Sequence, residues 1–116
     1  MTLRLGNITL DCDDTMSVAT FWAAALGRDL DQGASMWFAS IGLGGPGPRW
    51  FFIKVPEAKT TKNRQHIDYE TDDRPAEVER LVGLGASKIG DKDEHGHQWT
   101  VMTDIEGNEF CVSGSQ

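Results

Sequence analysis

Residues 66–71 carry the side chains best suited to proton-transfer chemistry. Side chains alternate between the two faces of a strand, so His66, Asp68 and Glu70 would share one face. An imidazole exchanges protons near neutral pH and a nearby carboxylate can tune it, which makes His66 and Asp68 the candidate catalytic residues. The alternative is that His66 only forms hydrogen bonds with a ligand. Strand positions two apart lie about 7 Å apart, so the pair needs a bridging water or ligand unless the side chains lean together.

The same pattern occurs near the start of the chain. Residues 7–14 (NITLDCDD) align with residues 66–73 (HIDYETDD), 59 positions later. In the first copy Asn7 and Thr9 hold polar positions, so we expect them, together with Glu70, to bind a ligand.

Similar elements follow both copies. Each Asp-Asp pair precedes a helical pattern that ends at a glycine, with Asp14 and Asp73 as N-caps and Gly27 and Gly85 as C-caps. Pro75 fits the first turn of the second helix. Two clear strands follow each helix, and a weaker candidate strand lies between the second helix and its two strands. The strand segments are residues 35–41, 49–55, 86–89, 98–103 and 109–114. Each half therefore predicts a strand, a helix and about three strands.

Two turns extend the alignment into the last strand of each half. Residues 47–50 match residues 107–110, which pairs Phe51 with Cys111. By strand alternation, Phe51 and Cys111 join the polar face of their halves, which predicts a cavity that is half apolar and half polar. Trp99 is the tryptophan we expect to contact a ligand ring. The alternatives are a solvated outer sheet face and, for Trp99, core packing.

Residues 91–97 (DKDEHGH) begin like a calcium-binding loop, but the twelfth position is Met102 and a strand pattern follows. We therefore expect a mobile or solvated loop near Trp99.

Composition limits the function classes. The chain has 116 residues, a formal net charge of −7 and two cysteines. One domain of this size can form a core without disulfides. The chain has an excess of acidic residues and lacks the net positive charge that is typical of nucleic-acid-binding proteins. No apolar run reaches the ~20 residues of a membrane helix. We expect a cytoplasmic protein that acts on a small-molecule partner, without nucleic-acid or membrane partners.

Several segments resemble the vicinal oxygen chelate superfamily, which includes glyoxalases, dioxygenases and bleomycin-resistance proteins. They are NITLDCDD, FWAAALG, KVPEAKTTKNRQHIDYETDD and HGHQWTVMTDIEGNEFCV, and the last is similar to the glyoxalase-like subgroup. The resemblance implies an α+β fold, with two βαβββ modules (about 1–57 and 62–116) in a single domain, residues 1–116. Their mixed and antiparallel sheets would curl into a cup with the helices outside. Because relatives often pair as dimers, the resemblance also implies a possible homodimer, although a single chain with both modules could close its own cup.

The resemblance also implies four metal-ligand positions, which here hold Asn7, Phe51, His66 and Cys111. Only His66 is a standard ligand, while Cys111 could ligate as a thiolate. Catalytic zinc needs three protein donors, so we predict no cofactor; a divalent metal, if bound, would use His66 and Cys111.

The expected function is to bind or act on a small polar or ring-containing metabolite without a standard metal site. The alternatives are a metal-dependent lyase, isomerase or dioxygenase of the same superfamily, and a drug-sequestering binder of the resistance type.

Overall fold

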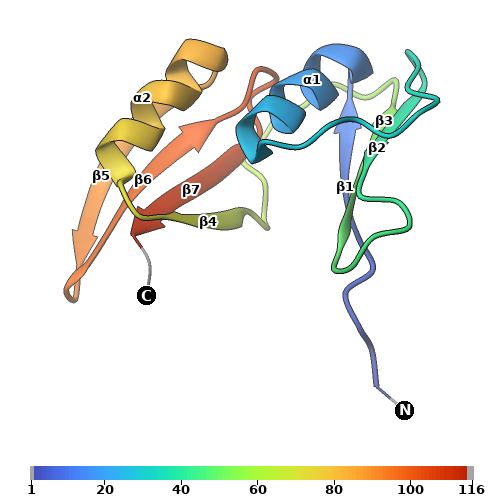
Figure 1. The fold of residues 1–116 in the computed structure, drawn as a ribbon. Coiled ribbons are helices and arrows are strands. Elements are labelled where there is room, and N and C mark those ends of the chain that lie inside the picture. The colour runs from blue at the N-terminus through green and yellow to red at the C-terminus, as the bar shows by residue number, and fades with distance from the viewer. Residues whose placement is uncertain (1, 115–116) are drawn as a thin grey trace. The chain divides into compact units, whose positions relative to one another are not determined.

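The computed structural model describes residues 2–114 and shows seven strands and two helices in this range (Figure 1). In chain order the elements are β1 (Asn7–Cys12), α1 (Thr15–Leu26), β2 (Phe38–Ile41), β3 (Arg49–Lys54), β4 (Ile67–Thr71), α2 (Arg74–Leu84), β5 (Ser87–Glu94), β6 (His97–Thr103) and β7 (Glu109–Gly114). The chain divides into two compact units, Met1–Ala58 and Lys59–Gln116, called the first and second modules below.

The first module has a three-stranded sheet in the order β1-β3-β2. β3 is parallel to β1 and antiparallel to β2. Asp14 is the N-cap of α1, and its side chain accepts a hydrogen bond from the Ser17 amide. Gly27, in the left-handed conformation, is the C-cap of the same helix. Helix α1 packs on one face of the sheet, and the buried side chains of this module include Val18, Phe21, Trp22, Ile41 and Phe52.

The second module has a four-stranded sheet in the order β4-β7-β6-β5. β4 and β7 are parallel, and the other neighbours are antiparallel. Asp73 caps α2 by accepting from the Ala76 amide, and Pro75 lies in the first turn. Helix α2 covers one face of this sheet (Figure 1), and the buried apolar side chains include Val78, Leu81, Met102, Phe110 and Val112. The opposite face of this sheet is called the open face below.

The structure confirms the α+β class, the two related modules and the capping residues. Two details of the expectation are wrong. Within the described residues of the first module, only two strands follow α1, because residues 27–37 lack strand pairing. Residues 91–97 do not form a loop: β5 and β6 pair along their length and turn at His95 and Gly96, both with positive φ.

None of the helices in residues 2–114 is long and apolar enough to cross a membrane.

Two glycines near the end of α2 should respond oppositely to alanine. A Cβ at Gly83 meets no neighbouring atom within 4 Å, so Gly83→Ala should raise the free energy of unfolding by up to about 1 kcal/mol. Gly85 has a φ of 119°, and a Cβ there would lie 3.0 Å from Ile105 Cγ2. Gly85→Ala should therefore lower the free energy of unfolding by about 1–2 kcal/mol. Urea unfolding followed by circular dichroism measures both, and shifts of the same sign would contradict the α2 C-cap assignment.

Candidate functional site

The pairing of β4 with β7 builds the candidate site. Asp68 lies opposite Cys111 in this parallel register, so both side chains project from the open face. On the helix-facing side, Tyr69 and Phe110 make an edge-to-face contact with ring centroids 5.9 Å apart. The apolar contact fixes which face of each strand is buried, and it thereby directs Asp68 and Cys111 to the other face.

His66 immediately precedes β4, and the chain entering this strand is tied to the start of β7. The Lys59 ammonium lies 3.1 Å from a carboxylate oxygen of Glu109. The other carboxylate oxygen of Glu109 accepts a hydrogen bond from the Asn63 amide at 3.0 Å. These two contacts hold the segment just before His66 beside β7.

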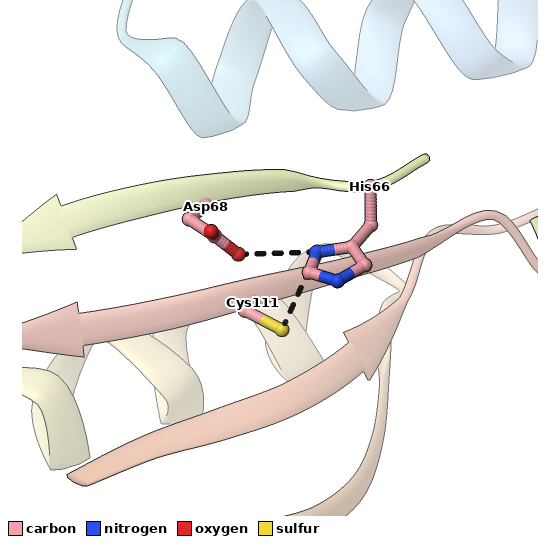
Figure 2. Close-up of side chains that lie close together, drawn as sticks. All are labelled: His66, Asp68 and Cys111. Carbon is pink, nitrogen blue, oxygen red and sulfur yellow. Dashed lines mark hydrogen bonds and ion pairs between the residues drawn. The ribbon is translucent and has the colours of Figure 1, made fainter. Parts of the chain in front are cut away.

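His66, Asp68 and Cys111 come together on the open face (Figure 2). His66 Nδ1 lies 3.1 Å from Asp68 Oδ1 and 3.9 Å from Cys111 Sγ. The three ligand atoms lie within 4.8 Å of one another. The expectation that His66 and Asp68 need a bridging water or ligand is therefore wrong, because their side chains lean together and bond directly.

The contact with Asp68 determines which ring nitrogen of a neutral His66 carries the proton. An ionised carboxylate can only accept hydrogen bonds, so Nδ1 must be the donor. The lone pair then lies on Nε2, on the other side of the ring from Asp68 (Figure 2). The His66 side chain is 38% exposed, so Nε2 can act as a base toward a ligand.

Cys111 is a neutral thiol in this environment. Burial raises its pKa to about 11, and the Asp68 charge and a hydrogen bond to that carboxylate act in the same direction. The positive charge of Lys62 opposes this shift. A nucleophilic triad is not supported, because Asp68 and Cys111 both approach Nδ1, whereas a triad engages the two ring nitrogens separately.

Glu70 and Trp99 share the open face with these three side chains. In the sheet register, Glu70 and Trp99 are both paired with Ser113. This row lies two residues along the strands from the row that joins Asp68, Cys111 and Val101, and so on the same face. Glu70 is exposed and Trp99 is half-buried. Strand alternation predicted that His66, Asp68, Glu70 and Cys111 share one face, and the register agrees; the place of Trp99 on that face was not predicted.

The first module carries the remaining candidates, Asn7, Thr9 and Phe51. Asn7 and Thr9 are exposed on β1, and Thr9 pairs with Phe51 on β3. Phe51 contacts Phe38 edge-to-face with ring centroids 5.2 Å apart. Phe38 was not among the residues predicted from the sequence, although its place in the strand pattern of residues 35–41 was the available signal.

Comparison with known proteins identifies one family model that matches the sequence and several solved structures with a similar fold. A family model described as a glyoxalase-like domain matches residues 7–113. No curated protein matches the chain in sequence.

Three solved structures illustrate the structural likeness. A glyoxalase/bleomycin resistance protein/dioxygenase family enzyme from Burkholderia phytofirmans PsJN has 16% identity and a TM-score of 0.79, over 98% of this chain and 100% of that one. Lactoylglutathione lyase from Agrobacterium tumefaciens has 12% identity and a TM-score of 0.70, over 99% and 96%. A bleomycin-binding protein from Streptomyces verticillus, complexed with copper(II)-bleomycin, has 18% identity and a TM-score of 0.67, over 100% of both chains. At these identities the likeness shows the fold alone.

The side chains at the four metal-ligand positions implied by the resemblance do not form a standard site. Phe51 has no donor atom and contacts another phenylalanine, and Asn7 offers only a neutral amide oxygen. His66 and Cys111 are the two remaining donors, and Asp68 lies beside them although it holds none of the four positions.

Alkylation should report the protonation of Cys111. A rise of the pKa from 9.0 to about 11 lowers the thiolate population near neutral pH about a hundredfold. The iodoacetamide rate at Cys111, followed by peptide mass spectrometry, should therefore keep rising about tenfold per pH unit beyond pH 9. Asp68→Asn should shift this profile to lower pH because it removes a negative charge.

The urea-unfolded chain is the control, and its rate should level off near pH 9. Steric shielding of Cys111 alone would lower the alkylation rate of the folded protein by the same factor at every pH. A folded-state profile that also levels off near pH 9 would contradict the raised pKa.

Proposed function

This chain belongs to the glyoxalase-like domain family, and we propose that it binds a small polar or ring-containing metabolite on the open face of the second module. In this proposal His66 exchanges a proton with the bound molecule and Asp68 positions the imidazole. The observation that carries the proposal is the 3.1 Å contact between His66 Nδ1 and Asp68 Oδ1.

Asp68 supports proton transfer in two ways. Its hydrogen bond orients the ring and leaves the Nε2 lone pair available to a ligand. Its negative charge stabilises the imidazolium that forms when Nε2 takes a proton. Because Cys111 is a neutral thiol, it serves as a weak polar and packing contact for the ligand in this proposal.

Trp99 and its neighbours support the ring-containing ligand class. An indole offers a flat apolar surface for stacking, and Ser113, opposite it on β7, has a small side chain. Glu70, in the same row, is the polar contact that we assign to the ligand's donors. On the first module, we propose Asn7, Thr9 and Phe51 as ligand contacts.

The second candidate is a binder that sequesters a drug without turnover. The observation that favours it is the likeness to the bleomycin-binding protein over the full length of both chains. Large aromatic drugs would use the same tryptophan surface, but no proton transfer would follow. The two candidate functions therefore predict the same result in a binding experiment, but only the first predicts that the bound molecule is converted to a product.

Ligand binding should quench or shift the fluorescence of Trp99. We expect at least one compound in a library of small polar and ring-containing metabolites, with bleomycin included, to change the emission of the wild-type protein. Trp99→Phe should remove most of that change. Trp37→Phe is the matched control, because Trp37 is 64% exposed in the first module. A change lost in Trp37→Phe and kept in Trp99→Phe would contradict the proposed surface.

Substitution of His66 separates turnover from binding. For a compound that binds, His66→Gln should keep the affinity within a few-fold and lower kcat by about 100-fold or more, which is the usual contribution of a general base. Product formation can be followed by mass spectrometry. Binding without turnover by the wild-type protein would support the sequestering candidate, and unchanged kcat in the variant would contradict the role of His66.

A further inference from the structure

We infer that His66, Asp68 and Cys111 form a binding site for a divalent cation of the zinc type, contained within the second module. The inference goes beyond the proposed function, because it requires no organic ligand. It also departs from the four positions implied by the resemblance: two of those positions lack a usable donor, and Asp68 supplies a third donor from outside that set.

The spacing of the three donors matches a tetrahedral metal. With ordinary zinc bond lengths, tetrahedral angles place a nitrogen and an oxygen ligand about 3.3 Å apart, and a nitrogen and a sulfur ligand about 3.6 Å apart. Here His66 Nδ1 lies 3.1 Å from Asp68 Oδ1 and 3.9 Å from Cys111 Sγ. The third pair, Asp68 and Cys111, also lies within 4.8 Å, so side-chain rotations must bring these two donors closer together, while the strand backbones that carry them can stay in place.

The chemistry of the donors selects the cation class. Imidazole and thiolate sulfur suit zinc and cobalt, whereas calcium and magnesium require oxygen ligands. When the cation binds, a metal–sulfur bond forms, the Cys111 S–H bond breaks and its proton leaves to solvent. Three protein donors leave one position for water or a ligand atom.

The site is open to a cation from solvent, and the sheet holds one of its three ligands in place. Asp68 is 66% exposed and His66 is 38% exposed, so a hydrated cation can approach from solvent. Cys111 is 7% exposed and is held in the sheet by its pairing with Asp68 and Val101. The arrangement combines one fixed sulfur ligand with two accessible ligands.

The cation and the proton compete for His66. A metal on Nδ1 takes the place of the Nδ1 proton, which is lost to solvent while Nε2 gains a proton from solvent; the hydrogen bond to Asp68 is broken and Nε2 becomes a donor. Metal-bound protein should therefore lack the base assigned to His66 in the proposed function. Failure of the cation inference leaves that proposal intact, because the experiment below uses no organic ligand.

Cobalt(II) is the probe of choice, because bonds from cobalt to thiolate sulfur give a charge-transfer absorption in the near ultraviolet. We would titrate untagged, reduced, chelator-treated protein with CoCl₂ and then displace the cobalt with ZnCl₂. The expected result is a charge-transfer band that saturates at one cobalt per chain and disappears as zinc binds. A band that is absent, or that saturates at another ratio, would overturn the inference.

Single-residue variants test each ligand. Cys111→Ser should abolish the charge-transfer band. Loss of an outer contact to a metal ligand costs about 10–100-fold in affinity, so Asp68→Asn and His66→Gln, which remove direct ligands, should each weaken binding at least tenfold. Asp68 is exposed, so its substitution tests the site even if Cys111→Ser disturbs the fold.

The matched controls are Asp93→Asn and His97→Ala, which remove an exposed carboxylate and an exposed imidazole elsewhere in the same sheet. Both controls should bind cobalt like the wild-type protein. Asp68→Asn with wild-type affinity, or a control variant with the larger loss, would overturn the three-residue assignment.

Discussion

The parallel register of β4 and β7 is the constraint on which the candidate site depends. It places Asp68 opposite Cys111, and it turns Tyr69 and Phe110 toward the helix. A slip of one residue would send each of these side chains to the opposite face and would bury a carboxylate under α2. The apolar packing of the module therefore enforces the same arrangement that brings the polar groups together.

Much of this arrangement follows from the sequence. The internal repeat predicted two modules, the Asp-Asp pairs predicted the helix starts, and strand alternation predicted that His66, Asp68 and Cys111 share a face. These features depend on local periodicity and capping, which a single sequence carries directly.

Other features depend on side-chain conformation and pairing between strands. Strand spacing alone gave a separation of about 7 Å for His66 and Asp68, but it does not specify how side chains lean, and Nδ1 and Oδ1 in fact approach to 3.1 Å. The polar composition of residues 91–97 favoured a loop, but residues 91–94 extend β5 because they form hydrogen-bonded pairs with β6. In the first module, residues 27–37 have no strand partner despite the repeat.

The two modules share a fold and differ in their chemistry. In the first module, the position equivalent to Cys111 holds Phe51, which contacts another aromatic ring. In the second module, a histidine, a carboxylate and a thiol meet within 4.8 Å. The two modules can share a packing pattern and differ on the sheet face away from the helix, because the buried faces alone hold each sheet to its helix. Proton exchange and cation binding are consequently both assigned to the second module.

The most direct test of this account is the protonation pattern of His66 in metal-free protein. Long-range proton–nitrogen correlation spectra of ¹⁵N-labelled protein, recorded under alkaline conditions where imidazoles are neutral, distinguish the two tautomers. His66→Gln would assign the signal among the three histidines of the chain. The account predicts the proton on Nδ1 and the lone pair on Nε2, with the preference lost in Asp68→Asn. A proton on Nε2 in the wild-type protein would contradict the hydrogen bond on which the site depends.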